Sequence, residues 1–580
     1  MDKSPAGSPG LAGSFAEALG HYQLGRLADA ERLCGQILAA TPSRHEALHL
    51  LGLVAARSGH AKAASELIAQ AISLRDDVAD YHFNFGLLLQ QAGDLDAATV
   101  SFERASSLRE GFVDAHNNLA VLHLLQGRLD RAAAGFERVL RLQPDRADVA
   151  CNLGVVLQQL GRPEAAVAQF ERSLALRPNY PEAAYNLGVA FERQGRAIDA
   201  IAPLEQALSL RPDYAEAAQA LSLVLNNLGV ALHGEGRLNE AIGYHERALA
   251  LQPDHANMRL TLSLARLACG ELDEGWRLYE ARWLTDHFDA MRRRFDAPRW
   301  NGSTGSGGTI LIWAEQGFGD TLQFCRYAPL VAQRGWRVVV EVQPMLVRLM
   351  QSLADVTVVP IGATATSNID CHCPMMSLPL LFETTLETIP AAMPYLAPAP
   401  DDVRRWRRVL TRSRGDRPAG LTVGLCWAGN PRTDSPVLSA VDARRSMALD
   451  QLAPLFTVEG VRFVSLQKEL GQADDPARYA MLDPMGEVED FADTAAIISA
   501  LDLVIAVDTS VAHLAGALGK PVWLLNRFDT CWRWLRGRTD SLWYPTLRQF
   551  RQEAFCSWDN VIAEAATELS ALAVSPRPLK

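Results

Sequence analysis

Small and apolar residues recur along the first half of the chain with a period of 34 residues. One glycine keeps this spacing apart from a single interval of 41, at Gly25, Gly59, Gly93, Gly127, Gly161, Gly195, Gly236 and Gly270. Five residues later an alanine stands in seven of the eight copies, at Ala30, Ala64, Ala98, Ala132, Ala166, Ala200 and Ala241. A large aromatic residue often follows: Phe102, Phe136 and Phe170 lie four positions after the alanine, Tyr244 lies three after Ala241, and Tyr279 lies four after Gly275, which replaces the alanine. Small residues let two helices approach closely and glycines mark turns, so each unit predicts a helical hairpin stacked on its neighbours.

The eight copies resemble the tetratricopeptide repeat. The resemblance implies an α-solenoid over residues 14–290, preceded by residues 1–13, which are rich in Gly, Ser, Pro and Ala and which we expect to be disordered. The interval of 41 adds seven residues near Ala215 to Leu221, close to two helical turns. We expect one longer helix there; a register change that re-aims the downstream region is the alternative.

An asparagine recurs two residues before the small residue of the first helix in five consecutive repeats, at Asn84, Asn118, Asn152, Asn186 and Asn227. Asparagine is a middling helix former, so helix stability gives little reason to repeat it. An amide can both donate to and accept from a peptide backbone. The series resembles the asparagine ladder of O-linked N-acetylglucosamine transferase, which implies that these residues bind an acceptor polypeptide. The alternative is that they bond adjacent repeats or water.

The pattern changes after a turn-rich connector at residues 301–308. Short apolar runs predict six buried strands, at Thr309–Trp313, Arg337–Val342, Leu421–Trp427, Val461–Leu466, Leu503–Val507 and Pro521–Leu525. Helices are expected between them, including a charged one at Asp401–Arg414. This alternation predicts two Rossmann-like α/β lobes, residues 291–400 and 401–570, with a tail at 571–580. Their cleft, at the carboxyl ends of the strands, is the expected ligand site, as in the GT-B layout.

Two turns after predicted strands carry candidate chemistry. Glu315-Gln-Gly-Phe-Gly-Asp320 follows the first strand, with Gly317 and Gly319 allowing close approach to the backbone and Asp320 opening a helix. Asp508-Thr-Ser-Val-Ala-His513 follows Leu503–Val507, where helix amides and the hydroxyls of Thr509 and Ser510 suit a phosphate. Simple helix caps at Asp320, Asp508 or Ser510, and a structural His513, are the competing interpretations.

Further strings complete a family resemblance, among them GLCWAGNP, RRSMAL, VSLQK and the whole segment 490–523. They resemble bacterial repeat-linked glycosyltransferases related to heptosyltransferases and, more distantly, to O-linked N-acetylglucosamine transferase. The resemblance implies that Asp320 is a base or positions the acceptor. It also implies donor contacts from a set of residues in both turns and beyond: Gly317, Gly319, Arg445, Ser446, Lys468, Asp508, Thr509, Ser510 and His513. Arg445 and Lys468 are equally compatible with solvated surface charges.

One segment departs from this family. Relatives commonly carry Asp-Trp-Arg-Trp near the end, whereas this chain has Cys531-Trp-Arg-Trp534. The change puts the identity of the donor sugar in doubt. A subset of relatives with this segment is similar to flagellin glycosyltransferases that use nonulosonic acids, which makes flagellin a candidate acceptor.

Charge and cysteine content indicate which class of partner and which cellular compartment to expect. Lys and Arg number 56 against 67 Asp and Glu, a formal charge of −11, which disfavours nucleic acid as a partner. Nine cysteines without regular spacing suit free thiols in the cytoplasm, and no apolar run is long enough to predict a membrane span or a signal peptide. Cys371-His-Cys373 lacks a second ligand pair, so we expect burial there and neither a metal nor a resident cofactor.

These observations predict a metal-independent, inverting protein O-glycosyltransferase that uses a nucleotide sugar. A non-catalytic scaffold with a degenerate transferase region, and a transferase acting on lipid or polysaccharide, are the alternatives. The sequence carries no indication of the oligomeric state.

Overall fold

The computed structural model describes residues 9–289, 291–363, 368–412, 420–431, 436–469, 471 and 474–574. It divides into two compact units, residues 1–224 and 225–580, and the boundary falls inside a helix of the repeat array. The sequence places the change of fold near residue 291. The last repeats therefore belong to the same compact unit as the α/β region.

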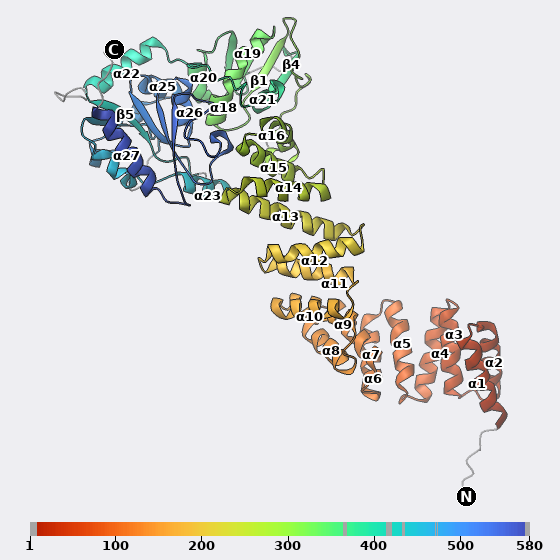
Figure 1. The fold of residues 1–580 in the computed structure, drawn as a ribbon. Coiled ribbons are helices and arrows are strands. Elements are labelled where there is room, and N and C mark those ends of the chain that lie inside the picture. Colours follow the sequence, from red (N-terminus) through yellow and green to blue (C-terminus); the bar gives the residue numbers. More distant parts are fainter. Residues whose placement is uncertain are drawn as a thin grey trace. The chain divides into compact units, whose positions relative to one another are not determined.

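The repeats form sixteen helices, paired as eight hairpins (Figure 1). Their bounds are α1 Pro9–Gln23, α2 Leu27–Ala40, α3 His45–Arg57, α4 Ala61–Leu74, α5 Ala79–Gln91, α6 Leu95–Leu108, α7 Val113–Leu125, α8 Leu129–Leu142, α9 Ala147–Gln159, α10 Pro163–Leu176, α11 Pro181–Arg193, α12 Ala197–Leu210, α13 Ala215–Glu235, α14 Leu238–Leu251, α15 Ala256–Cys269 and α16 Leu272–Tyr279. Helix α1 begins at Pro9, so the expectation that residues 9–13 are disordered is wrong; residues 1–8 lie outside the described residues.

The repeated small residues sit where helices touch. A β-carbon added to Gly86 or Gly154 would lie 2.7 or 2.6 Å from the ring of Phe102 or Phe170, so only glycine fits. All eight glycines of the 34-residue series adopt positive φ, from 70° to 86°, which explains their place in the turns. The seven extra residues lengthen α13 to 21 residues, which confirms the longer helix.

The α/β region has two parallel sheets. The first has the order β3-β2-β1-β4, with β1 Thr309–Trp313, β2 Arg337–Val342, β3 Val356–Pro360 and β4 Cys371–Pro374. The second has the order β6-β5-β7-β8-β9, with β5 Leu421–Cys426, β6 Val461–Ser465, β7 Leu503–Val507, β8 Val522–Asn526 and β9 Leu547–Arg551. The six strands expected from the sequence are confirmed to within a residue or two, while β3, β4 and β9 were not expected.

Helices and short helical turns precede, connect and follow these strands. They are η1 Glu280–Leu284, α17 Asp286–Asp289, α18 Phe318–Phe324, η2 Cys325–Tyr327, α19 Ala328–Gln333, η3 Pro344–Leu346, α20 Val347–Met350, η5 Met375–Ser377, α21 Leu378–Leu381, α22 Pro400–Arg412, α23 Pro436–Arg445, η6 Leu449–Leu452, α24 Ala453–Phe456, η7 Pro476–Tyr479, η8 Met485–Glu487, α25 Phe491–Ser499, α26 Ser510–Ala517, η9 Trp532–Trp534 and α27 Asp559–Val574. Helix α27 continues through residues 571–574, which the sequence assigned to a tail. Helices α18 and α26 contact each other where the two lobes meet.

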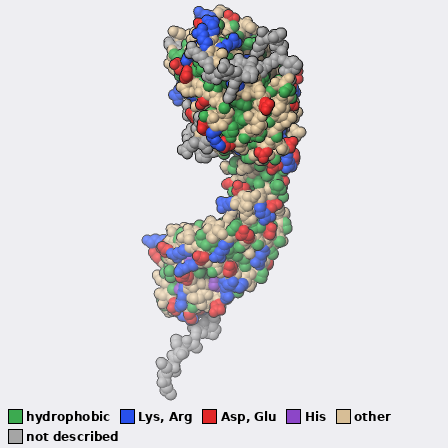
Figure 2. Space-filling view, turned by 90° about the vertical axis from the view of Figure 1, so that its left-hand side faces the viewer, with side chains coloured by type: hydrophobic (Ala, Val, Ile, Leu, Met, Phe, Trp, Pro, Cys, Tyr) green, Lys and Arg blue, Asp and Glu red, His purple; other side chains and the backbone are tan. Residues whose placement is uncertain are grey.

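The surface carries mixed charge. On the face of the N-terminal unit drawn in Figure 2, Lys and Arg side chains lie interspersed with Asp and Glu. No helix in the described part of the chain combines the length and the apolar character needed to cross a membrane.

Candidate functional site

A cavity of about 670 Å³ lies in the C-terminal unit, within the size range of ligand pockets. Four of its walls are the turns that follow strands β1, β5, β6 and β7, which places it at the carboxyl ends of strands from both sheets. This is where open parallel sheets bind ligands. The position agrees with the cleft expected from the sequence.

The structure brings most of the predicted site residues together around this cavity. Those lining it are Gly317, Gly319, Asp320, Arg445, Lys468, Asp508, Thr509, Ser510 and His513. Ser446 does not line it, contrary to a direct donor contact. Its hydroxyl instead accepts from the Gly429 amide at 2.9 Å and donates to the Asp442 carboxylate at 3.2 Å, so it fixes the turn after β5.

Asp320 occupies the third position of α18, and both oxygens of its carboxylate are engaged. Oδ2 accepts from the Gly317 amide at 3.1 Å, a local helix-start bond. Oδ1 forms an ion pair with the guanidinium of Arg533, which comes from the other lobe. The local cap and the position in the cavity therefore coexist. A carboxylate offers about four acceptor sites, so capacity remains for one more donor.

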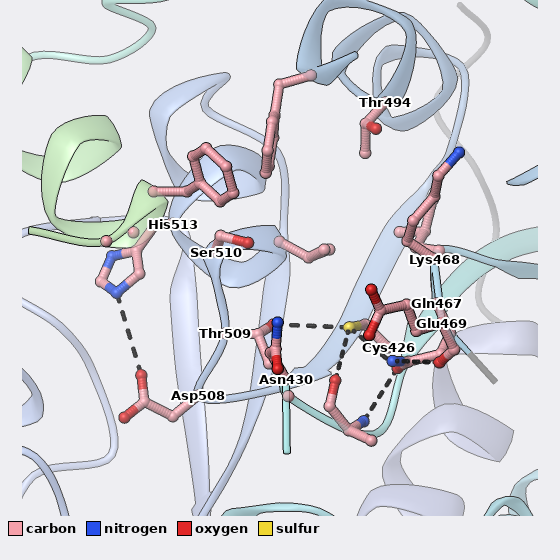
Figure 3. Close-up of a pocket in the computed structure, with 18 of the residues that line it drawn as sticks. Cys426, Asn430, Gln467, Lys468, Glu469, Thr494, Asp508, Thr509, Ser510 and His513 are labelled. Atoms are coloured by element: carbon pink, nitrogen blue, oxygen red, sulfur yellow. Dashed lines mark hydrogen bonds and ion pairs between the residues drawn. The ribbon is translucent and has the colours of Figure 1, made fainter. Parts of the chain in front are cut away.

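The start of helix α26 provides an anion-binding geometry. Thr509 is its N-cap residue, and the first bond within the helix runs from the Ala512 amide to the Thr509 carbonyl at 3.1 Å. The amides ahead of it have no acceptor within the helix and carry the positive end of its dipole. The Thr509 hydroxyl lies 3.6 Å from the Cys426 thiol, and Figure 3 shows Thr509 and Ser510 across the pocket from Lys468. Burial raises the pKa of Cys426 to about 11, so this thiol is neutral.

His513 lies one turn into α26 and is buried. Burial lowers its pKa to about 4, despite the opposing effect of Asp508. Its Nδ1 lies 2.9 Å from the Tyr544 hydroxyl, and its ring stacks on Trp534 with 5.0 Å between the ring centroids. Its Nε2 is 4.0 Å from Asp508 Oδ1 (Figure 3). The imidazole is thus neutral at pH 7 and offers one N–H, not a positive charge.

Two of the cations that line the cavity, Arg445 and Lys468, were expected from the sequence. Arg445 donates to the Asp442 carboxylate at 2.8 Å and to the Asp508 carbonyl at 3.0 Å, so part of its charge is already compensated. Lys468 donates to the carbonyls of Met485 and Val488, at 3.0 and 2.6 Å. Among the described residues no carboxylate forms an ion pair with Lys468, so its charge stays available to an anion in the cavity.

The five asparagines do not share one environment. The Asn84 amide lies 2.9 Å from His49 Nε2, and the Asn186 amide donates to the Cys151 thiol at 3.7 Å. Both partners belong to the preceding repeat, so these two amides have the structural role that the sequence left open. Asn118 and Asn152 are half-buried, and Asn227, which belongs to the other unit, is exposed.

Sequence reasoning missed three residues of the site. Arg533 and Arg527 line the cavity, and the Gln467 side chain accepts from the amides of Trp427 and Ala428 at 3.2 and 3.0 Å, which holds the turn after β5. The Cys-Trp-Arg-Trp segment was the only signal for Arg533.

The Cys371-His-Cys373 sequence forms β4, with both cysteines buried as expected. The His372 ring accepts from the Trp313 indole at 3.3 Å. Within the described ranges, no group of three or more His, Cys, Asp or Glu side chains has the geometry to hold a metal ion.

Comparison with known proteins matches the tetratricopeptide-repeat family at residues 15–79, 79–112, 112–179, 145–213 and 179–254. Protein FlbA of Caulobacter vibrioides is 29% identical over 342 residues, 53% of this chain and 54% of FlbA. The chain therefore spans about half the length of that curated relative.

Two similar solved structures are YrrB, a TPR protein with an unusual peptide-binding site, and the C-terminal part of a TPR protein from Cytophaga hutchinsonii. YrrB is 24% identical with a TM-score of 0.29, covering 33% of this chain and 96% of YrrB. The Cytophaga protein is 15% identical with a TM-score of 0.37, covering 43% and 99%. The chain thus contains tetratricopeptide repeats in its N-terminal half, followed by an α/β region with two parallel sheets.

Proposed function

We propose that this protein is an inverting, metal-independent glycosyltransferase that transfers a sugar from a nucleotide-activated donor to a Ser or Thr hydroxyl of a polypeptide. The observation that carries the proposal is the convergence of three features on one cavity: the start of α26, the uncompensated Lys468 and the Asp320 carboxylate. The first two suit the phosphate of a donor, and the third suits a hydroxyl. The family resemblance of the sequence supports the same reaction.

The reaction follows from these groups. The acceptor oxygen attacks the anomeric carbon, and the bond between that carbon and the donor phosphate oxygen breaks. The hydroxyl proton passes to a free lone pair of the Asp320 carboxylate. The charge that develops on the leaving phosphate is stabilised by Lys468 and by the amides at the start of α26. His513, neutral and held by Tyr544, contributes an N–H donor at most.

The repeats supply the protein partner in this proposal. Tetratricopeptide repeats form protein-interaction surfaces, and the amides of Asn118 and Asn152 are the candidates for contacts to an extended acceptor. Flagellin, with a nonulosonic acid as the sugar, is the first acceptor to test because the segment at Cys531 resembles that group of transferases.

Intact-mass analysis tests the proposal directly. Flagellin is co-expressed with the sugar-synthesis enzymes, with and without this protein. We expect a mass increment only when the protein is present, and its size names the sugar. Asp320→Ala should abolish the increment while flagellin still co-purifies, whereas Asp540→Ala, an exposed carboxylate paired with Arg538, should leave it unchanged. Undiminished modification by Asp320→Ala would remove Asp320 from the mechanism.

A non-catalytic scaffold is the second candidate, because two donors already engage the Asp320 carboxylate. Calorimetry with UDP, GDP and CMP separates the two: a scaffold binds partner protein and none of these nucleotides. A lipid or polysaccharide acceptor is separated by Asn118→Ala/Asn152→Ala, which would then leave transfer unchanged.

A further inference from the structure

The segment between β8 and β9 links the two lobes at the cavity. Arg533 lies in η9 and belongs to the second lobe, yet its guanidinium pairs with Asp320 of the first. The same guanidinium lies 4.2 Å above the Trp532 ring and donates to the Cys531 thiol at 3.0 Å. Its Nε is buried and has no hydrogen-bond partner among the described residues. The Trp532 ring therefore packs on the face of the Arg533 guanidinium, while Asp320 and Cys531 bind its terminal N–H groups.

The last repeats hold this segment from the other side. Trp276 of α16 is only 1% exposed. It packs edge-on against Trp532 and against Phe324 of α18, with ring centroids 5.1 and 6.0 Å apart. One indole therefore contacts both the helix that carries Asp320 and the turn that carries Arg533. Further along the segment, Arg536 donates to the Gly236 carbonyl at 2.6 Å, which fixes a second point.

The first-lobe turn is anchored by the same helix, α16, and by η1, which follows it. The Gln316 amide donates to the Tyr279 hydroxyl at 2.8 Å, and Glu315 accepts from buried Arg282 at 2.7 Å. The residues on both sides of the Asp320–Arg533 pair are therefore fixed by the end of the repeat array, which suits a role in setting the orientation of a carboxylate.

The charge of Arg533 is also fixed. Burial alone would lower the pKa of Arg533, but Asp320, Cys531 and Tyr279 together more than offset this and the pKa is raised. The nearby His513 is neutral and cannot replace it. Arg533 is consequently the permanent positive partner of Asp320. Because Nη1 donates to Cys531 while Nη2 donates to Asp320 Oδ1, the guanidinium constrains the direction of the carboxylate.

We infer that Arg533 is a positioning residue: it orients the Asp320 carboxylate toward the acceptor hydroxyl and acts through Asp320 alone, without binding the donor. This inference rests on the proposed function. It assigns a role to the segment in which this chain departs from its relatives, and it makes the last repeat part of the site.

The test compares Arg533→Met, Arg533→Lys and Arg538→Met, in the full chain. Arg538 lies in the same segment, is half-buried and pairs with Asp540, so it is a matched control that does not line the cavity. With the nucleotide sugar that the wild type uses, we expect Arg533→Met to lower kcat about 100-fold, Arg533→Lys to recover part of the loss, and Arg538→Met to match the wild type. The Kd of the corresponding free nucleotide (UDP, GDP or CMP), measured by calorimetry, should stay within about twofold in all three.

Two results would overturn the inference. A tenfold or larger loss of nucleotide affinity in Arg533→Met would make Arg533 a donor ligand, and an unchanged kcat would leave it without a role in transfer. Asp320→Asn/Arg533→Met adds a further check, because it should be no slower than Asp320→Asn alone if Arg533 acts only through Asp320. A wild-type chain that transfers no sugar would instead contradict the proposed function, and the positioning role with it.

Discussion

The backbone of Gly319 approaches the imidazole of His513 so closely that a β-carbon at residue 319 would lie 3.0 Å from His513 Cδ2. The two residues belong to different lobes. Gly319 therefore makes room for the other lobe, whereas the sequence assigned it to close approach of a ligand. Gly319→Ala should push α18 and α26 apart next to Asp320, lower the stability by about 1–2 kcal/mol and reduce transfer.

Urea unfolding checks this prediction. All 12 tryptophans lie between residues 276 and 558, so their fluorescence follows the C-terminal unit alone. Gly243→Ala is the matched control, because nothing lies within 4 Å of the added carbon and its helix should gain up to about 1 kcal/mol. Equal stability and activity of Gly319→Ala and the wild type would contradict the close contact.

Lys468→Met should weaken nucleotide binding about 10- to 100-fold, because it removes the cation that no described carboxylate compensates. Lys520→Met is the control: its ammonium also donates to a backbone carbonyl, that of Ser499 at 3.1 Å, but does not line the cavity. Calorimetry with UDP, GDP and CMP measures both. Matching affinities in the two variants would place the phosphate elsewhere.

His513 should make the C-terminal unit less stable in acid. Its pKa is about 4 in the folded protein, below the ordinary value of 6.5, so between pH 6.5 and 4 the unfolded chain binds a proton that the folded chain refuses. This contribution to stability is present above pH 6.5 and is lost as the pH falls, by at most about 1.4 kcal/mol per unit.

The difference between wild type and His513→Gln isolates this effect, since His245 and His372, whose pKa values burial also lowers to about 4, are present in both proteins. Urea unfolding followed by tryptophan fluorescence at several pH values should give a shallower acid slope for the variant. Parallel curves would show that folding does not lower the pKa of His513.

Asn118→Ala/Asn152→Ala should raise the KM for the protein acceptor about tenfold or more, because each lost hydrogen bond costs roughly 1 kcal/mol. Asn84→Ala and Asn186→Ala should chiefly lower the melting temperature, since these amides bond His49 and Cys151. Transfer kinetics and circular dichroism separate the two outcomes. If all four asparagines behaved alike, their differing environments would have no functional meaning.

A fragment of residues 225–580 should fold and bind nucleotide, whereas residues 291–580 should not. The shorter fragment lacks Trp276, Tyr279 and Arg282, and so uncovers Phe324 and Trp532 and leaves buried Glu315 without its arginine. Tryptophan fluorescence and nucleotide calorimetry on both fragments check the prediction. A well-folded, binding-competent 291–580 fragment would contradict it.

The sequence predicts the parts of this fold that depend on local pattern. The glycine series finds the eight hairpins because positive φ is required at each turn, and Leu503–Val507 is found because a doubly buried strand is apolar throughout. Strand β9, Leu547–Arg551, is missed because three of its five residues are polar, and β4 because it has only four residues, one of them a histidine and one a proline.

The candidate site, like the fold, can be predicted from the sequence only where a local pattern determines it. Asp320, Lys468 and the start of α26 are predictable because each follows a strand at its carboxyl end. The pairing of Asp320 with Arg533 is not predictable, because 213 residues separate the partners and only the packing of the two lobes brings them together. The contribution of Trp276 is hidden for the same reason, since its repeat gives no sign that its last helix is buried against another fold.

The anchoring of the final hairpin limits how such a chain can evolve. Duplication or deletion of whole 34-residue blocks leaves the junction intact only upstream of α13, because Gly236, Trp276 and Arg282 must be inherited together with the α/β body that they contact. Engineered chimaeras that graft a foreign array should therefore be spliced ahead of residue 215, where α13 begins. Arrays of different length could then be exchanged on the same body while its cavity keeps its shape.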